Sequence, residues 1–522
     1  MVISQNHSIK LYFPYTFESS ADPAAYQGFL DQKIALKVQE LTEAADFLSS
    51  QSHQQQLQSS LWEIKTTQLD KRFHEFSSSL VNGEINTDFS QGFFGMPPLS
   101  LSKQALRTLN NGTPNHLGTG VAISLKQAAT NRLKAIGITA PLDNDQWPMM
   151  FNEVSFYGLN FGVGMLVIDL AFKQPVKNGA AISHLQALLE INYAIARNSN
   201  DHQAISINWG TDPDHSDSSP STTKGLSPLI DRLMPTEEIA SLNLRACKDR
   251  NNTYSYVFLA SEESLDREAK ENCVFRIARK YNDLYLPENP QQQISYFEPF
   301  KTITHAFSLE GCCTYVDWSL YQDDVPESIK NFGKTAVKQA YAPLILLTYA
   351  EYIFLREMAG NSHQKQIDMN NPTGENLDRL RKYRSKLYDF RLNFRFTQIS
   401  SNTNHNLFCN TNKQALEIEQ LLTDTTNDVD EVEQYIADHV SQQQEARLRK
   451  FGILGSLFAA IIGWVDLWGL NLHDIIYQPS DIEPSSIAVF LLVLVALTVT
   501  VILSSRSPKP SKTNLPKTNK KV

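Results

Sequence analysis

Several patterns that mark common protein classes are missing from the sequence. Its 522 residues include five cysteines, and none of them forms a Cys-x-x-Cys pair. We therefore expect neither a disulfide scaffold nor a zinc finger, and an odd, unpatterned set of thiols is typical of a reducing cytosol. Residues 1–13 also lack a basic start followed by an apolar run, so we expect no secretory signal.

Motifs that carry catalysis are missing as well. Residues 1–330 contain no Walker phosphate loop, no Gly-x-Ser-x-Gly elbow and no His-Glu-x-x-His zinc motif, so we expect neither an enzyme nor an organic cofactor. One acidic segment, with Asp212, Asp214 and Asp217, can present oxygen ligands to a hard metal cation, although it lacks the glycine and glutamate of an EF-hand. A solvated loop is the simpler interpretation of that segment.

The charge balance restricts the partners. The chain has 47 Lys and Arg against 56 Asp and Glu, a net charge of −9, which argues against a general binder of nucleic-acid polymers. Its mean hydropathy of −0.31 excludes a carrier buried mostly in lipid. The charge is uneven, because residues 506–522 carry six basic side chains and no acidic one. These residues therefore form a separate basic tail.

Residues 1–330 mix strand-like and helix-like patterns. Apolar and β-branched runs predict strands at 9–13, 163–170, 204–208, 254–260, 274–278 and 314–318. Helical spacing predicts helices at 35–48, 126–135 and 183–197. Together they indicate a cytosolic α/β or α+β domain in which helices pack on a sheet.

Residues 331–450 are predicted to be helical. The apolar stretch 341–355 contains Pro343 and Glu351 and is too short to cross a bilayer, so we expect a buried helix there. Two seams with heptad spacing follow: Leu380, Tyr383, Leu387, Phe390 and Phe394, then Ile418, Leu422, Thr425, Val429, Val432 and Ile436. A polar gap at 400–405 separates them. Neither Gly nor Pro occurs between 406 and 451, so the second seam is predicted to continue unbroken into the next apolar segment.

Two apolar segments, 451–472 and 486–505, are each long enough to cross a bilayer as a helix. Basic residues precede the first and follow the second, whereas the loop 473–485 holds acidic residues and no Lys or Arg. Because basic residues collect on the cytoplasmic side, we expect a plasma-membrane hairpin with both chain ends in the cytoplasm. The predicted organisation is thus an α/β domain (1–330), a helical stalk (331–450), a two-helix hairpin (451–505) and a basic tail (506–522). A buried soluble hairpin is the alternative.

The first apolar segment ends in Trp468-Gly469-Leu470-Asn471. This sequence lies at the end of a predicted span that continues from the stalk, and an acidic loop follows it. The arrangement resembles the CorA-type magnesium transporter superfamily, whose first span ends in an aromatic-Gly-Met-Asn signature. Gly469 and Asn471 match that signature, and Leu470 stands where the family has Met. The resemblance covers residues 330–522 and is only architectural over the rest.

The resemblance implies a homopentamer in which five stalk helices surround one pore through the lipid bilayer. Asn471 of each subunit would accept a hydrated Mg²⁺ or another divalent cation, Gly469 would permit a tight chain path, and Leu470 would pack the turn. The physics is consistent, because Mg²⁺ gives up its water reluctantly and a first site should bind those waters rather than remove them. A capped helix end is the alternative for these three residues.

Acidic residues near this signature are candidates for the pore mouth. Asp466 lies one turn before it, where an ionisable side chain faces either the pore or the membrane interface. Loop acids would raise the local cation concentration, namely Asp474, Asp481 and Glu483. Solvated loop acids are the simpler alternative for these three.

The inner half of the first span supplies candidates for the pore wall. Ser456, Ala459 and Ile462 would line a mostly apolar pore. At the cytosolic end, Leu448 and Phe451 would form a hydrophobic gate that closes by dewetting.

Two other functions fit the same architecture. A ligand-gated membrane effector, of the kind attached to CRISPR-associated antiviral systems, would combine an enlarged cytosolic domain with an altered signature and open on binding a small nucleotide. A membrane-anchored sensor or scaffold would use the hairpin as an anchor and transport nothing. A monomeric mass in detergent would favour the anchored sensor.

Overall fold

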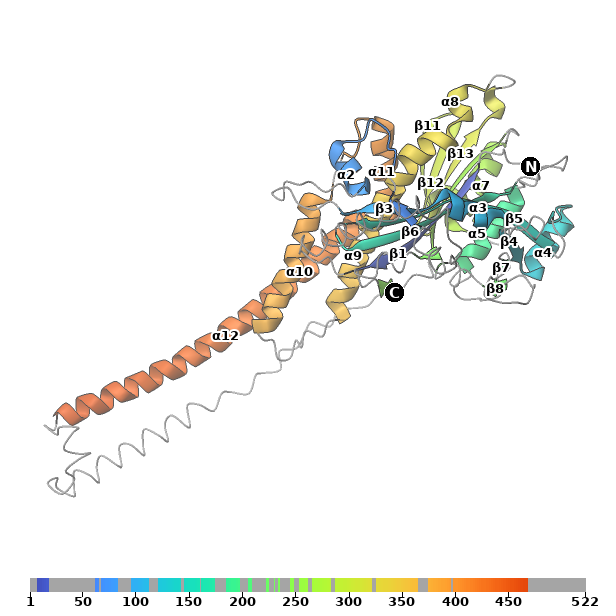
Figure 1. Ribbon diagram of the computed structural model, residues 1–522. Coiled ribbons are helices and arrows are strands. Elements are labelled where there is room, and N and C mark those ends of the chain that lie inside the picture. Colours follow the sequence, from blue (N-terminus) through green and yellow to red (C-terminus); the bar gives the residue numbers. More distant parts are fainter. Residues whose placement is uncertain are drawn as a thin grey trace, which may run out of the picture. The chain divides into compact units, whose positions relative to one another are not determined.

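A computed structural model describes most of the chain (Figure 1). The described residues are 7–17, 62–64, 67–82, 95–111, 121–141, 145–159, 161–173, 185–197, 205–208, 222–224, 230, 233–234, 245–247, 253–261, 265–282, 287–321, 325–364, 374–395 and 398–467. Contacts divide the chain into two compact units, residues 1–365 with 386–427 and residues 366–385 with 428–522.

One sheet organises the first unit. Its strands are β1 (Ser8–Thr16), β2 (Trp62–Ile64), β3 (Gly95–Leu101), β4 (Val121–Leu125), β5 (Gln146–Leu159), β6 (Val163–Phe172), β7 (Ile205–Asn208), β8 (Thr222–Lys224), β9 (Arg245–Ala246), β10 (Tyr254–Ser261), β11 (Ser295–Phe300), β12 (Ile303–Phe307) and β13 (Gly311–Asp317). Their main order is β11-β12-β13-β10-β1-β6-β5-β4-β7-β8, with β2 and β3 beside β5 and β9 beside β1. The described pairings are antiparallel except β10–β13, which is parallel.

Helices cover both faces of this sheet (Figure 1). On one face, α3 (Lys103–Asn111), α4 (Gln127–Ala135), α5 (Leu185–Arg197) and α7 (Arg267–Arg279) share a buried apolar core with alternate residues of the strands. The other face contacts α2 (Glu75–Asn82), the π-helix η7 (Gly333–Tyr341), α9 (Ala342–Gln364) and α11 (Thr403–Ala415). Short helical turns η5 (Pro290–Gln292), η6 (Ser319–Tyr321) and α8 (Glu327–Lys330) connect these elements. The sheet is thus the middle layer of three.

Two longer helices contribute to both units. They are α10 (Gly374–Asn393) and α12 (Ile418–Leu467). Within the second unit, Leu377 and Leu380 of α10 pack with Ile436 of α12 in a small apolar cluster. Ion pairs accompany it, because Arg384 lies 3.2 Å from Asp430 and 2.8 Å from Glu433. Apolar contact and opposite charges therefore hold these two helical segments together.

Most of the predicted elements are confirmed. The mixed sheet with helices on it fits the expected α/β class, and the predicted strands at 9–13, 163–170, 204–208, 254–260 and 314–318 fall on β1, β6, β7, β10 and β13. The predicted helices at 126–135 and 183–197 correspond to α4 and α5, and the apolar stretch 341–355 lies in α9. The predicted helix 35–48 lies outside the described residues. All five cysteines are buried thiols that take part in no disulfide.

The prediction of a strand at 274–278 is wrong, because these residues form the last turns of α7. A short apolar run does not distinguish a strand from a buried helix by its periodicity. Local signals settle the matter: Asp266 caps the helix by accepting from the amide of Ala269 at 2.7 Å, and Lys280 ends it in a left-handed conformation. The run is apolar because the helix buries it in the core.

The heptad seams are confirmed as buried at most positions, whereas Tyr383, Phe394 and Val432 are half-buried. Leu380, Leu387 and Phe390 are buried in α10, and the polar gap separates α10 from α11. In α12, Ile418, Leu422, Thr425, Val429 and Ile436 are buried. As the absence of Gly and Pro predicts, α12 continues for 50 residues, about 75 Å, into the first predicted membrane segment.

A membrane-crossing helix is not found among the described residues, where no helix is long and apolar enough to cross a bilayer. The second predicted span, 486–505, lies outside the described residues, as do the last five residues of the first. The hairpin therefore stays a prediction.

Candidate functional site

The structure describes only part of the predicted pore. Gly469, Leu470, Asn471, Asp474, Asp481 and Glu483 lie outside the described residues, as do the weak metal candidates Asp212, Asp214 and Asp217. Asp466 lies in the last turn of α12. Within the described part of the chain, no group of three or more His, Cys, Asp or Glu side chains could hold a metal ion. The predicted filter thus remains untested.

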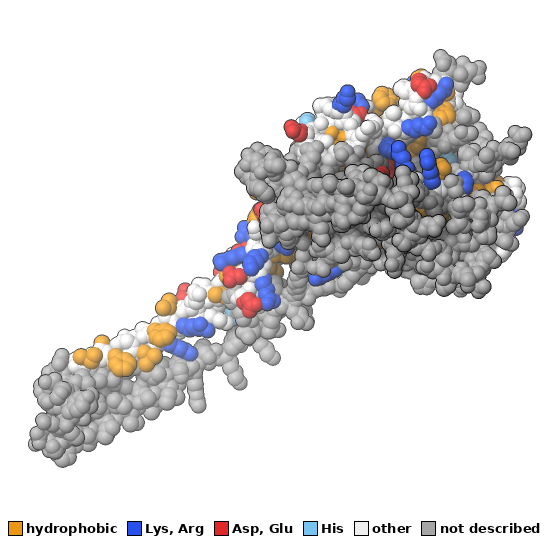
Figure 2. All heavy atoms as spheres, viewed as in Figure 1, with side chains coloured by type: hydrophobic (Ala, Val, Ile, Leu, Met, Phe, Trp, Pro, Cys, Tyr) orange, Lys and Arg blue, Asp and Glu red, His pale blue; other side chains and the backbone are white. Residues whose placement is uncertain are grey.

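The other pore candidates lie along the end of α12 and are exposed. Leu448 is 69% exposed, Phe451 71% and Ile462 50%, and Ser456 and Ala459 are exposed between them. Phe458, which sequence analysis did not select, is 64% exposed. Figure 2 shows these hydrophobic side chains gathered at the end of α12, next to Lys and Arg side chains. The helix thus changes from a buried seam to an exposed apolar surface along its length.

A second candidate site is a polar pocket of about 380 Å³ in the first unit, between the sheet and the η7–α9 helices. Three adjacent strands form its floor. Register places Lys10 of β1 opposite Asp169 of β6, and Asp169 opposite Glu153 of β5. The next row contains Tyr12, Val167 and Ser155. Because side chains alternate along a strand, these residues face one side while Ile9, Leu11 and Phe13 face the apolar core.

A β-bulge in β5 directs one of the two carboxylates, that of Glu153, into the pocket. Trp147, Met149 and Phe151 face the apolar core before the bulge, and Val154 and Phe156 face it afterwards. The register shifts between Phe151 and Glu153. The extra residue, Asn152, donates from Nδ2 to Asp169 Oδ1 at 3.2 Å. Bulges occur often beside functional sites because they redirect side chains, and this one keeps Glu153 on the pocket side.

A buried ion pair lies at the pocket floor. Lys10 Nζ donates to Asp169 Oδ2, and the two side chains are only 8% and 11% exposed. Burying one such charge alone would be very unfavourable, so each requires the other. The floor is therefore polar but electrically balanced.

Helix η7 and the start of α9 form the opposite wall. Lys338 Nζ lies 3.1 Å from Glu153 Oε2, and Glu153 Oε1 accepts from Ser155 Oγ at 2.9 Å. Tyr12 Oη donates to the carbonyl of Ala342 at 3.2 Å. Lys334, one turn before Lys338, also lines the pocket and is exposed. Lys334 and Lys338 thus lie on the exposed side of the wall that η7 forms.

Hydroxyl groups supply neutral hydrogen-bonding positions. Burial, reinforced by Glu153, raises the pKa of Tyr157 above its usual value, and burial likewise raises the pKa of Tyr12. Both phenols therefore stay protonated at neutral pH and can donate or accept. Tyr157 Oη lies 3.5 Å from Thr67 Oγ1 at the pocket edge. Such an arrangement suits binding of a polar molecule.

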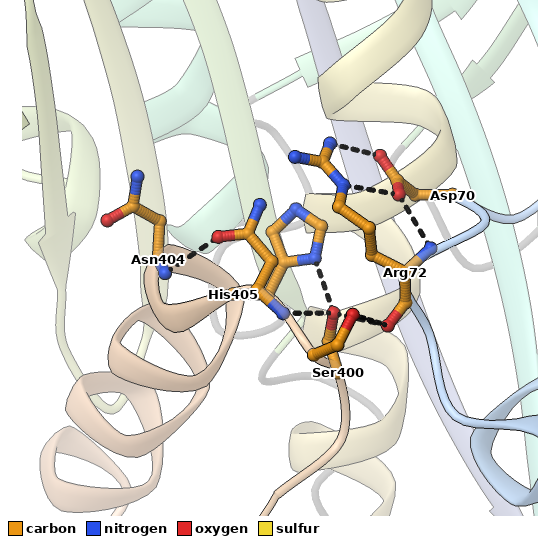
Figure 3. A network of polar contacts seen from close by, with 7 residues as sticks. Asp70, Arg72, Ser400, Asn404 and His405 are labelled. Carbon is orange, nitrogen blue, oxygen red and sulfur yellow. Dashed lines mark hydrogen bonds and ion pairs between the residues drawn. The ribbon is translucent and has the colours of Figure 1, made fainter.

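The segment that follows Thr67 is fastened to α11 by a polar staple, which we define as Asp70, Arg72, Ser400 and His405 (Figure 3). Arg72 Nε donates to Asp70 Oδ1 at 2.7 Å, and this contact lowers the pKa of Asp70 to about 2. Ser400 Oγ donates to the Arg72 carbonyl at 2.8 Å and lies 3.1 Å from His405 Nδ1. The Asp70 carboxylate is thus already occupied by Arg72. We therefore interpret the staple as a structural contact between the two segments.

The staple also contacts η7. The Asp70 amide donates to the Gln339 carbonyl at 3.0 Å, and the rings of Tyr341 and His405 lie 5.8 Å apart in an edge-to-face arrangement. Burial lowers the pKa of His405 to about 4, so the ring is neutral at pH 7. One wall of the pocket is thus connected to α11 through ring and backbone contacts.

The pocket was not predicted from the sequence. A signal was present, because Lys10 and Asp169 interrupt strands that are otherwise apolar, and Asn152-Glu153 breaks the alternation of β5. Their convergence required the strand register, which pairs Lys10 with Asp169, 159 positions away, and Asp169 with Glu153, 16 positions away.

Comparison with known proteins gives little guidance to family. No model of a known protein family and no curated protein matches the chain. Among solved structures, the chain is similar to the CorA magnesium transporter from Methanocaldococcus jannaschii, with 12% identity over 49% of this chain and 91% of that one and a TM-score of 0.19. This similarity is weak, and no family membership follows from it.

Proposed function

We propose that the chain is the subunit of a CorA-type homopentameric channel for Mg²⁺ or another divalent cation in the plasma membrane. The observation that carries the proposal is α12, which is continuous from a buried seam to an exposed apolar surface. Contiguous exposed apolar surface marks a site that meets a partner or a membrane. Lipid and neighbouring copies of the same helix would cover Leu448, Phe451, Phe458 and Ile462.

The charge pattern supports the same proposal. Arg447, Arg449 and Lys450 precede the apolar end of α12, and the basic tail follows the second apolar segment. This distribution is typical of a hairpin with both ends in the cytoplasm. In five copies around an axis, Asn471 would then form a ring of amide oxygens at the outer end, able to bind a hydrated cation.

Reconstituted vesicles test the proposal directly. The full chain is purified in detergent, its mass is measured, and it is placed in liposomes loaded with a magnesium-sensitive dye. We expect a pentameric mass and Mg²⁺-dependent dye response. Asn471→Ala should abolish the flux with the mass unchanged, whereas the matched control Asn519→Ala, in the basic tail, should keep it.

Other results would favour the rival functions. A monomer without flux would favour a membrane-anchored sensor. A pentamer that conducts only after a small nucleotide is added would favour the ligand-gated effector. Full flux through the Asn471→Ala variant would remove the filter from the proposal.

A further inference from the structure

We propose that the polar pocket binds a small organic phosphate monoester, with its phosphate at Lys334 and Lys338 and its polar body on the strand floor. The proposal concerns the first unit alone and holds whether or not the chain conducts ions. It rests on four features of the pocket, namely its charge balance, its volume, the placement of its groups and the helix that forms its wall.

The charge balance favours an anion. The pocket contains two carboxylates, and each already has a lysine: Asp169 binds Lys10, and Glu153 binds Lys338. Lys334 is a third cation on the same wall, with no ion-pair partner among the residues that the structure describes. A cation would have to compete with lysines for both carboxylates. An anion can bind Lys334 without displacing a carboxylate and can share Lys338 with Glu153.

The volume fits one small organic molecule. About 380 Å³ lies at the low end of ligand pockets and would hold roughly a dozen waters. A bare anion such as inorganic phosphate would leave much of that space to solvent. A polymer or a folded partner does not fit. The pocket is therefore matched to a phosphate with a compact body attached.

The groups are placed for such a molecule. The two lysines at the edge are exposed, whereas Ser155 is 2% exposed and Tyr157 9% exposed at the floor. Phosphate offers three acceptor oxygens and up to two negative charges, so it can bridge two ammonium groups. The buried hydroxyls of Tyr157 and Ser155 can bind the hydroxyls or ring nitrogens of the body, and Thr67 and the exposed Gln68 offer further polar groups at the pocket edge.

The wall helix is an independent sign of function. Helix η7 is a π-helix of nine residues, a rare conformation that occurs frequently at functional sites. It places Lys334, Lys338 and Gln339 on the pocket side. Its first residue, Gly333, lies so close to Phe258 that a Cβ there would collide with the ring. The wall is thus held tightly against β10.

Binding is tested with the full chain in detergent by calorimetry and thermal shift. The probes are ribose 5-phosphate and AMP, with inorganic phosphate, ribose and succinate as comparisons. We expect saturable binding of at least one ester, weaker binding of inorganic phosphate, and none of ribose. Equal or tighter binding of succinate would overturn the assignment to phosphate, and absence of saturable ester binding would overturn the site.

Variants assign the two ends of the ligand. Lys334→Ala should weaken binding of the ester and of inorganic phosphate alike by about tenfold, since one charge-assisted contact is lost. Lys301→Ala, at an exposed turn outside the pocket, is the matched control and should change neither. Tyr157→Phe removes one hydroxyl and should weaken binding of the ester but leave binding of inorganic phosphate unchanged. Unaltered affinity in Lys334→Ala would contradict the proposal.

Hydrogen exchange locates the bound ligand independently. The ester should slow exchange in 67–74 and 333–346, because these segments form the pocket wall and the staple connects them to α11. Protection confined to other segments would place the ligand elsewhere and contradict the proposal.

Discussion

The two faces of strands β1, β5 and β6 come from the same nine- to fourteen-residue segments but have different roles. One face presents Leu11, Phe156 and Ile168 to a continuous apolar core. The other presents Lys10, Glu153 and Asp169 to a pocket. The difference teaches that the face of the sheet to which a side chain points decides its role. Residues on one face contribute to stability, and residues on the other contribute to specificity.

The largest effect should come from the apolar face. Phe156→Ala removes a fully buried ring, and we expect it to lower the free energy of unfolding by about 3–5 kcal/mol, because it leaves a cavity in the core. Urea denaturation followed by tryptophan fluorescence measures this loss. A cost below about 1 kcal/mol would mean that this face contributes no more than the polar one.

The buried ion pair sharpens the comparison. Asp169→Leu leaves Lys10 buried without its partner and should cost roughly 3 kcal/mol. The double variant Lys10→Met with Asp169→Leu should recover most of that stability, because an apolar pair can replace a buried ion pair. Its ester binding should be no stronger than that of the parent. Additive losses in the double variant would show that the two charges act independently.

The smallest effect should be a dependence of the folding stability on pH. It should be confined to the side of the sheet that contacts η7 and α11. Burial lowers the pKa of His405 to about 4 and that of His305 to about 3, from 6.5. The unfolded chain therefore takes up these protons at a higher pH than the folded chain. The stability gained from neutral rings is complete above about pH 6.5 and is lost as pH falls towards 4 and 3.

Denaturation at pH 7 and pH 5 tests this dependence. His405→Phe should reduce the difference in stability between the two pH values, because it removes one of the two rings whose pKa is lowered by burial. Hydrogen exchange at pH 5 should rise first in α11. An earlier rise in α7 would place the acid-sensitive layer on the opposite face.

Most of the strands and helices were predictable from the sequence, because alternating and helical patterns depend on consecutive residues. The continuity of α12 was equally accessible, since it depends on the absence of helix breakers. The error at 274–278 came from an apolar run that is too short to have a period. The pocket was out of reach, because Lys10, Glu153 and Asp169 meet only through strand register, and the π-helical winding of η7 has no local sequence rule.

The bulge at Asn152 determines where β5 can lose a residue without exchanging its two faces. A deletion outside the bulge, such as that of Ser155, would exchange the apolar and polar sides of the adjoining part of β5 and send Phe156 into the wrong layer. Loss of Asn152 alone would restore simple alternation and leave both sides in place. We therefore expect the fold to tolerate deletion of Asn152 better than deletion of Ser155.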